Sequence, residues 1–202
     1  MAHTTNQRFV KWIFAVGVIT LGGCAPWTQL KGQEYKFHAG GFKAQVPRDW
    51  MKANTGFFLM TRDGLALNEV SVKRYRFKDK LEHTAKRFFP QMLPQDLVEV
   101  EQDNFRANAN ITGFEIIRNE PRTIHGQDGY LIEYTFSTMR GLTYHGIQSG
   151  FAYDEKVYRI RYEAPQQHYY ETALSDFDTF LETFRLLKKE QEEKKLEKTK
   201  KK

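Results

Sequence analysis

The chain has 202 residues, of which 40% are hydrophobic, and 31 Lys and Arg face 25 Asp and Glu, so its formal net charge is +6. This length and composition are ordinary for a single globular domain. The excess positive charge lies in residues 1–23 and 188–202, which leaves residues 24–187 neutral and argues against a domain that binds nucleic acid through its phosphates. A single cysteine, Cys24, excludes an internal disulfide bond.

Residues 1–23 have the three parts of an export signal peptide. Two basic residues precede the apolar run Trp12–Leu21, and small residues follow it directly before Cys24. A run of about ten residues spans only about half of a ~30 Å hydrocarbon core, so it is too short for a permanent transmembrane helix. The pattern therefore predicts export, with cleavage between Gly23 and Cys24.

The stretch Leu21-Gly22-Gly23-Cys24 resembles the lipobox of bacterial lipoproteins. The resemblance covers the first 24 residues and implies diacylglycerol on Cys24 Sγ and a further acyl chain such as palmitate on the new amino terminus. Two or more chains anchor a protein stably to a membrane, whereas one does so only marginally. Ala25, where Asp would favour inner-membrane retention in Gram-negative lipoproteins, favours the periplasmic face of the outer membrane. An ordinary signal peptide with a chance cysteine is the alternative.

Alternating apolar residues predict strands along a single domain over residues 35–187, which a tether over residues 24–34 links to the anchor. In chain order the strands are Tyr35–Val46 with an interruption at Gly40-Gly41, Phe57–Thr61, Leu65–Tyr75, Gly113–Arg118, Arg122–His125, Gly129–Ser137, Thr143–Tyr153 and Val157–Glu163. Short polar segments predict hairpins centred on residues 62–64, 119–121 and 154–156. In the last strand the charged face consists of Arg159, Arg161 and Glu163.

Helical spacing of apolar residues occurs in three places. Leu81 to Phe89 predicts a helix that Pro90 ends, and Pro94 is expected to start a second helix, followed by a polar loop over Asn104–Asn110. The most regular stripe predicts a long C-terminal helix with an apolar face for a sheet, and it consists of Tyr170, Leu174, Phe177, Leu181 and Phe184. Residues 188–202 form a Lys- and Glu-rich tail, either a helical extension or disordered.

Four stretches resemble PsbP-like domains, including the DcrB-type bacterial lipoproteins. Phe42–Trp50 is similar to their opening strand followed by Pro-x-x-Trp, Gln127–Tyr134 and Lys156–Tyr162 to their central strands, and Phe177–Arg185 to their closing helix. The resemblance implies an α+β domain in which an antiparallel sheet has helices on both faces, an α/β/α sandwich with a long C-terminal helix. It implies no enzymatic activity, because the family has no shared catalytic set to place on this chain.

No residue pattern predicts catalysis or metal binding. Ser149 lies in Gly146-Ile-Gln-Ser-Gly150, whose glycines have the wrong spacing for a Gly-x-Ser-x-Gly nucleophile turn, and glycine-rich phosphate loops are absent. The histidines that follow the signal are scattered singly: His38, His83, His125, His145 and His168. A zinc site would need ligands from distant parts of the chain. We therefore expect no catalytic residue, no metal ligand and no cofactor.

Two basic segments are expected to be solvated. Lys73–Lys80 interleaves five basic residues with two aromatic ones and predicts a strand that leaves its sheet into a loop, with contact to anionic lipid headgroups or an acidic partner as the alternative. Lys188–Lys202 predicts a solvated tail, with contact to phosphate-bearing lipids as its alternative. Nucleic acid is not an expected partner of either segment.

The expected anchor and the missing catalytic patterns favour a non-enzymatic envelope module that binds another envelope protein or helps to maintain the envelope. The alternative is a carrier or sensor of a small amphiphile, which the 16 Phe and 10 Tyr suggest. A third reading is an unrecognised hydrolase. An apolar cavity of ~300 Å³ or more with a few polar groups would favour the carrier. The sequence alone names no ligand, no protein partner and no oligomeric state.

Overall fold

The computed structural model of the chain describes residues 27–200, apart from the side chains of 194–198 and 200. The expected signal peptide, its cleavage site after Gly23 and the lipid-bearing Cys24 lie outside the described residues.

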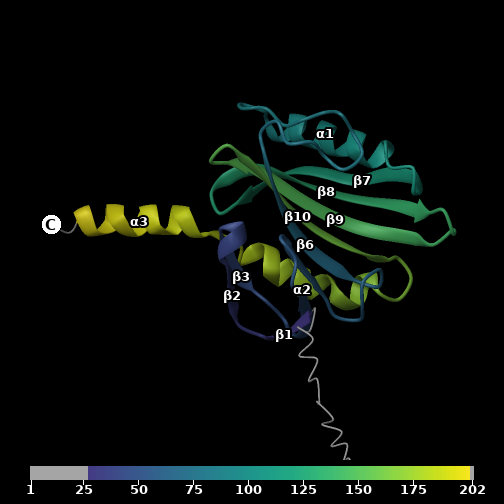
Figure 1. Ribbon diagram of the computed structural model, residues 1–202, viewed down its shortest axis with the longest axis horizontal. Coiled ribbons are helices and arrows are strands. Elements are labelled where there is room, and N and C mark those ends of the chain that lie inside the picture. Colours follow the sequence, from purple (N-terminus) through teal and green to yellow (C-terminus); the bar gives the residue numbers. More distant parts are fainter. Residues whose placement is uncertain (1–26, 201–202) are drawn as a thin grey trace, which may run out of the picture.

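Eight antiparallel strands form the main sheet in the order β1-β4-β5-β6-β10-β9-β8-β7 (Figure 1). Their bounds are Trp27–Lys31 for β1, Arg48–Ala53 for β4, Phe58–Thr61 for β5, Glu69–Arg76 for β6, Ile111–Ile124 for β7, Gln127–Thr138 for β8, Thr143–Tyr153 for β9 and Lys156–Pro165 for β10. A small sheet has the order β11-β3-β2, with β2 at Glu34–Phe37, β3 at Phe42–Gln45, β11 at Arg185–Leu186 and the 3-10 turn η1 at His38–Gly40. The helices are α1 at Pro94–Arg106, α2 at Tyr170–Glu182 and α3 at Leu187–Lys200.

The helices α1 and α2 belong to two separate hydrophobic clusters. Along β10, Tyr158, Ile160 and Tyr162 join the cluster that contains α2 and the small sheet, while Val157 joins the cluster that contains α1. Consecutive strand residues point to opposite sides, so this alternation follows from the period of two in the sequence. An antiparallel sheet flanked by helices, as predicted, is confirmed, and so is the hairpin around residues 154–156. The hairpin expected around residues 62–64 also forms, but its loop extends to Asn68, because β6 begins at Glu69 and not at Leu65 as predicted.

The expected tether over residues 24–34 is shorter than predicted, because Trp27–Lys31 form the edge strand β1. This strand pairs with β4, and Trp27 lies opposite Ala53. Only Leu30 of β1 is fully buried, at 4% exposure. A strand with a single buried side chain has no apolar alternation, so the sequence pattern could not show it.

The helix predicted between Leu81 and Pro90 does not form. Leu81 and Phe88 are buried in the α1 cluster, but Ala85 is exposed and Phe89 is 54% exposed, so these four residues at helical spacing do not share a buried face. The segment is instead closed by a hydrogen bond from the Lys78 backbone N–H to the Phe88 carbonyl, 3.2 Å long. The predicted start of α1 at Pro94 is confirmed, although this helix extends to Arg106, into the expected polar loop.

The hairpin predicted at residues 119–121 is also wrong, because Ile111–Ile124 form the one continuous strand β7. Pro121 lies within it, and β7 is the last strand of the sheet. A proline is tolerated on an edge strand, where its missing N–H group leaves no neighbour without a partner. Register shifts after Thr112 and Ile116 mark bulges, and Gly113 takes φ +61° there.

The long C-terminal helix ends earlier than predicted, at Glu182. Phe184, the last residue of the apolar stripe, is fully buried and stacks on Phe42 of β3 with ring centroids 4.8 Å apart. Its neighbours Arg185 and Leu186 pair with β3 as β11, and α3 follows. The apolar residues of the predicted stripe are therefore still buried beyond the end of the helix at Glu182.

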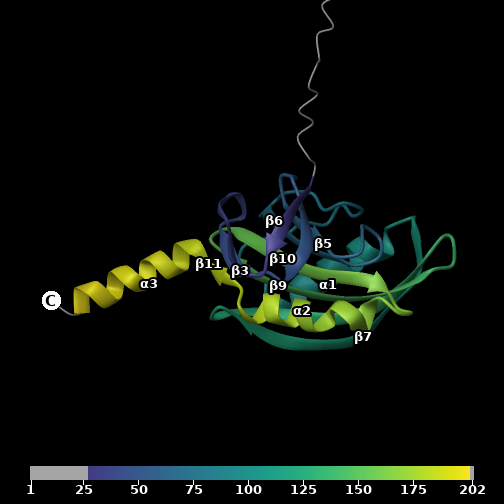
Figure 2. The same cartoon turned by 90° about the horizontal axis from the view of Figure 1, so that it is seen from below.

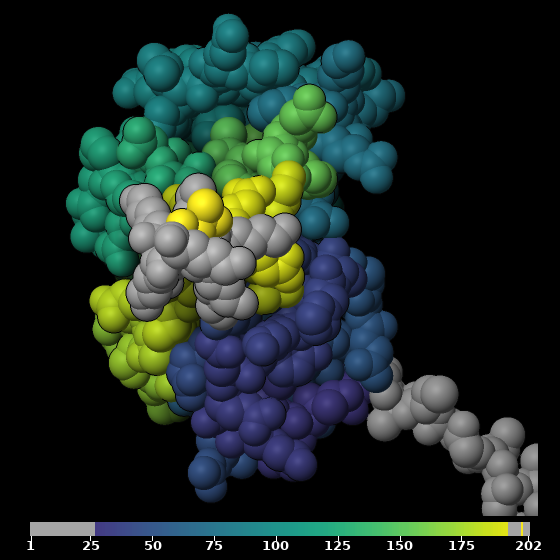
Figure 3. Space-filling view, turned by 90° about the vertical axis from the view of Figure 1, so that its left-hand side faces the viewer, coloured from purple at the N-terminus to yellow at the C-terminus, as the bar shows by residue number. Residues whose placement is uncertain are grey.

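The helix α3 projects away from the body, as Figures 1 and 2 show, and Figure 3 views the molecule from the end to which it points. Its first turns are held by polar contacts. Lys188 Nζ lies 2.9 Å from Asp154 Oδ1, and Lys189 Nζ donates to the carbonyl of His125 at 2.6 Å. The His125 ring adds a further contact, because Nδ1 accepts a hydrogen bond of 2.9 Å from the Leu186 backbone N–H.

Acid is expected to weaken this attachment through His125. Burial lowers the pKa of His125 from 6.5, and Lys189 and Arg185 lower it further against the opposite effect of Glu193 and Glu190. As the pH falls below about 6.5, His125 takes up a proton in the unfolded chain before it does so in the folded protein. The stability that neutral His125 contributes above that pH is therefore lost as the pH falls through its lower pKa in the folded protein. A proton on Nδ1 also removes the acceptor that β11 uses.

The measurement is the thermal midpoint at about pH 7.5 and about pH 5.5 for the wild type and for His125→Asn. We expect the wild type to lose more stability on acidification than the variant. Equal losses would show that His125 is not a source of the acid sensitivity.

Candidate functional site

Polar residues occupy adjacent positions on the face of the main sheet against which α1 packs. On β10, Arg159, Arg161 and Glu163 share this face, as the sequence predicted, and lie opposite Lys73, Ser71 and Glu69 of β6, respectively. On the other side, β9 places Gly150, Gln148 and Gly146 opposite the same three residues. The charged face of β10 is therefore the centre of a three-strand polar surface.

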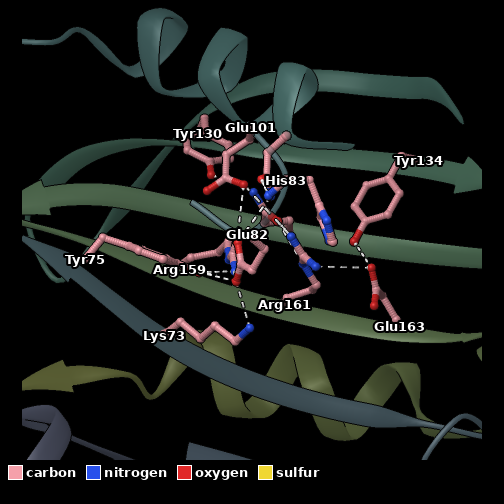
Figure 4. A network of polar contacts seen from close by, with 12 residues as sticks. Lys73, Tyr75, Glu82, His83, Glu101, Tyr130, Tyr134, Arg159, Arg161 and Glu163 are labelled. Carbon is pink, nitrogen blue, oxygen red and sulfur yellow. Dashed lines mark hydrogen bonds and ion pairs between the residues drawn. The ribbon is translucent and has the colours of Figure 1, made fainter. Parts of the chain in front are cut away.

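Arg159 is the centre of a buried ion network (Figure 4). Its side chain is 2% exposed, and its Nη1 atom lies 3.0 Å from Oε2 of Glu101, which α1 supplies and which is fully buried. Its Nη2 atom lies 2.5 Å from Oε1 of Glu82 and also donates to the Tyr75 hydroxyl. Lys73 Nζ reaches the same Glu82 oxygen at 2.8 Å. The network thus joins β6, β10 and α1 to the segment that replaces the expected helix.

The network is held in its charged form. Burial alone would raise the pKa of Glu82, but the charge of Arg159 and hydrogen bonds from Arg159, Lys73 and Tyr75 hold it well below its usual range. Burial likewise opposes the charge on Arg159, yet Glu101, Tyr75 and Glu82 raise its pKa. Among the described residues, Glu101 Oε1 is the buried side-chain oxygen without a hydrogen-bond partner. A buried ion cluster of this kind fixes the positions of its members more than it stabilises the fold.

Two glycines of β9 let tyrosines of β8 lie flat across the polar surface. A Cβ atom on Gly146 would lie 2.6 Å from the Tyr134 ring, and one on Gly150 would lie 2.7 Å from the Tyr130 ring. Tyr134 can therefore reach over β9 and donate a 2.7 Å hydrogen bond to Glu163. The glycines that surround Ser149 thus serve packing, and the Ser149 hydroxyl is buried and donates to the Tyr130 carbonyl.

A groove of about 480 Å³ lies beside the network on the same face of the sheet. Its apolar walls include Phe57, Leu59, Leu65 and Phe136. Its charged lining comprises Glu69, Lys73, Arg159, Arg161 and Glu163. The Tyr144 hydroxyl, also in the lining, donates a 2.6 Å hydrogen bond to the Ala66 carbonyl and so ties the β5–β6 loop to β9.

A second cavity, of about 580 Å³, lies between residues 85–92 and α1. Phe89, Met92 and Val100 supply apolar lining, and Lys86 and Asp96 contribute charges. Lys86 pairs with Asp103 on the outer side of α1. The first groove is the stronger candidate site, because its polar groups are buried or half-buried, converge from adjacent strands and include members of the ion network.

The histidines of the sequence analysis lie on separate elements. His145 Nε2 lies 2.8 Å from Glu133 and its ring stacks on Tyr170 at 3.7 Å, whereas His125 holds β11. The others lie in η1, in the 77–93 segment and directly before α2: His38, His83 and His168. Within residues 27–200, no group of three or more His, Cys, Asp or Glu is arranged to hold a metal ion. The same part of the chain contains no helix long and apolar enough to cross a membrane.

The basic segment Lys73–Lys80 is a strand that leaves its sheet, as predicted, because β6 ends at Arg76. Its cations have separate partners. Lys73 binds Glu82, and the Arg74 guanidinium donates to the Ala39 carbonyl at 2.9 Å. The sequence placed these residues correctly, but it did not predict that Lys73 would join a buried network.

The sequence analysis also missed Glu82 and Glu101. Glu101 is four residues from both Leu97 and Phe105, and all three are buried, so a charged residue lies within the apolar stripe of α1. That spacing is the signal that could have identified it. Glu82 offers no such signal, because the segment around it has no regular secondary structure.

This sheet order and these flanking helices define a domain of the PsbP/Mog1 type of fold, and the PsbP-like fold expectation is confirmed. No family model and no curated protein matches the sequence. The cyanobacterial PsbP (CyanoP) of Synechocystis sp. PCC 6803 is 18% identical, with a TM-score of 0.55 over 85% of this chain and 98% of that one. The Ran-binding protein Mog1p of Saccharomyces cerevisiae is 10% identical, with a TM-score of 0.53 over 79% and 97%. At these identities the likeness concerns the fold alone.

Proposed function

We propose that the chain is a lipid-anchored, non-enzymatic binding module of the cell envelope, and that its α/β/α domain holds a small amphiphile in the groove beside the Arg159 network. Acyl chains on Cys24 attach it to the membrane, at the periplasmic face of the outer membrane in a Gram-negative cell. A protein partner in the envelope, the other role expected from the sequence, would then receive or sense the bound molecule.

The groove is the observation that carries this proposal. Its volume of about 480 Å³ falls within the ~300–1,000 Å³ range of ligand pockets. Part of its lining is apolar, and three of its five charged side chains are held by Glu82, Glu101 and Gln148 before any ligand arrives. Fixed polar groups reduce the entropy that binding costs. A binding role also agrees with the use of this fold by the Ran-binding protein Mog1p.

The anchor is supported by Leu21-Gly22-Gly23-Cys24 and by the position of β1. Because β1 begins at Trp27, only Ala25 and Pro26 separate Cys24 from the sheet. Three residue steps span at most about 11 Å. Lipid on Cys24 would therefore hold this edge of the sheet close to the headgroups.

The anchor is tested by Cys24→Ala in a bacterial host fed radiolabelled palmitate. We expect labelling to be abolished and an uncleaved precursor to accumulate, because the residue that carries the lipid is gone. Ala25→Ser, which keeps the cysteine, is the matched control and should label normally. Unchanged labelling of Cys24→Ala, or an unmodified Cys24 thiol in the mass spectrum of the mature wild type, would contradict the anchor.

Amphiphile binding is tested with a fluorescent fatty-acyl probe and the full-length protein in nonionic detergent. Leu65→Glu puts a charge on an apolar wall at a side chain that is 50% exposed, so the fold should tolerate it while probe affinity falls about tenfold. Ile117→Glu makes the same type of change at a 55% exposed position on β7, outside the groove lining. Equal affinities of the two variants would place the probe elsewhere.

A further inference from the structure

One cation, Arg161, and two carboxylates, Glu69 and Glu163, remain partly accessible in the lining of the groove. Arg159 and Lys73 are both engaged by Glu82, and Arg159 is 2% exposed. Arg161 is 17% exposed and Glu163 15%, and both line the groove together with Glu69. Residues two apart on a strand lie on one face about 6.6 Å apart, so a positive and a negative position follow each other along β10.

Arg161 retains hydrogen-bonding capacity on the groove side. Its Nε and Nη2 atoms both donate to Gln148 Oε1, at 2.8 and 2.6 Å. Its Nη1 atom forms an ion pair with Glu163 Oε1 at 3.6 Å, too long for a hydrogen bond, and its Nη2 atom lies 3.9 Å from Glu101 Oε2. One face of the guanidinium lies over the Phe105 ring, 4.6 Å from its centroid. A guanidinium has five N–H donors, and the two on Nη1 suit an anionic oxygen of a ligand.

The carboxylates of Glu69 and Glu163 lie directly opposite each other on β6 and β10. Like charges at such a position are unfavourable, and burial together with the charge of Glu163 raises the pKa of Glu69. Arg161 and the Tyr134 hydroxyl contact Glu163. A cation bound beside these carboxylates would relieve their repulsion and would lie one position further along the same face of β10 than an anion on Arg161, about 6.6 Å away.

We propose that the groove selects an amphiphilic lipid whose zwitterionic headgroup carries a phosphate and an ammonium, as in phosphoethanolamine, with the phosphate on Arg161 and the ammonium between Glu69 and Glu163. This inference rests on the proposed function and adds the class of ligand. A purely anionic headgroup would be repelled by the two carboxylates, and a purely cationic one would be repelled by Arg161 and Lys73. Acyl chains would lie along the apolar wall of Phe57, Leu59 and Leu65.

The source of the ligand is the membrane, as the position of the wall indicates. Trp27, three residues after the expected lipid, pairs with Ala53, and the β4–β5 turn leads from Ala53 to Phe57 in the groove wall. Four residue steps span at most about 14 Å. The anchor therefore holds the apolar end of the groove near the bilayer from which a lipid would enter.

The test titrates full-length protein in nonionic detergent with three lipids of identical acyl chains and follows complexes by native mass spectrometry. The lipids are phosphatidylethanolamine, phosphatidylglycerol and diacylglycerol. We expect phosphatidylethanolamine to bind at least about tenfold more tightly than the other two, because only it places opposite charges at both subsites. Free phosphoethanolamine is the fourth ligand, and it should compete only weakly because it lacks the acyl chains.

Glu69→Gln is the decisive variant, since it removes one charge without changing shape and relieves the repulsion in the free protein. Its thermal midpoint should be equal to or above that of the wild type, and it should lose most of the preference for phosphatidylethanolamine over phosphatidylglycerol. Arg161→Gln should weaken both phospholipids about tenfold. Glu115→Gln on β7 and Arg106→Gln at the end of α1, both exposed, are the matched controls and should bind like the wild type.

The outcomes separate this inference from the proposed function. Equal binding of phosphatidylethanolamine and phosphatidylglycerol, or an unchanged preference in Glu69→Gln, would overturn the zwitterion inference and leave amphiphile binding intact. Competition by free phosphoethanolamine as strong as that of the lipid would overturn the membrane source. Binding of none of the three lipids would overturn both proposals.

Discussion

Arg159→Met is expected to lower the free energy of unfolding by about 3–5 kcal/mol. The guanidinium is the main charge partner of Glu101, whose side chain is fully buried. Its removal would leave a carboxylate in an apolar environment that already lacks a partner for one of its oxygens. An unpaired buried charge is far more unfavourable than the loss of an exposed ion pair. The expected loss of stability therefore comes mainly from the unpaired Glu101 carboxylate and less from the missing Arg159 interactions.

Urea unfolding followed by circular dichroism measures this effect, and a double variant identifies its cause. In Arg159→Met with Glu101→Leu, both buried charges are replaced by apolar side chains, and we expect most of the loss to be recovered. Glu82 keeps Lys73 and the Tyr75 hydroxyl as partners in that background. Arg118→Met, which breaks the more exposed pair with Glu133, is the control and should cost no more than about 1 kcal/mol. A double variant no more stable than the single one would contradict the explanation.

The parts of the fold that the sequence predicted are those that local periodicity determines. The β9–β10 hairpin, the start of α1 at Pro94 and the apolar stripe of α2 all follow from neighbouring residues. The errors arise where a distant contact decides the local structure. Between Leu81 and Pro90, the helical spacing was present, but the ion pairs of Glu82 with β6 and β10 hold the segment in an irregular conformation.

The candidate site was predictable only in part for the same reason. The alternation in Val157–Glu163 placed Arg159, Arg161 and Glu163 on one face, and this is how they lie. Their partners are far away in sequence, since Glu101 is 58 residues and Glu82 is 77 residues from Arg159. Sheet order decides which residues meet, and here β6 lies beside β10 although more than 80 residues separate Lys73 from Arg159. Strand patterns alone do not specify that order.

The Pro-x-x-Trp stretch that resembled PsbP-like domains acquires a physical role in the structure. Trp50 is fully buried in the α2 cluster, and its Nε1 atom donates a 2.9 Å hydrogen bond to Asp176 Oδ2 on α2. Asp49, the second residue of β4, takes φ +68° directly before Trp50, whose indole is buried. The motif therefore links α2 to β4 of the main sheet.

Trp50→Ala is accordingly expected to lower the free energy of unfolding by about 3–5 kcal/mol, through the cavity it creates and the lost contact with α2. Trp50→Phe keeps most of the packing and should cost less, and Asp176→Ala should cost about 1–3 kcal/mol because it leaves a buried indole N–H without an acceptor.

Urea unfolding of Trp50→Phe, Asp176→Ala and their combination gives the coupling between the two side chains. If the hydrogen bond joins β4 to α2, the combined loss is smaller than the sum of the single losses by about 1 kcal/mol. Additive losses would mean that Trp50 acts through packing alone, and a loss below about 1 kcal/mol in Trp50→Ala would contradict the anchoring role itself.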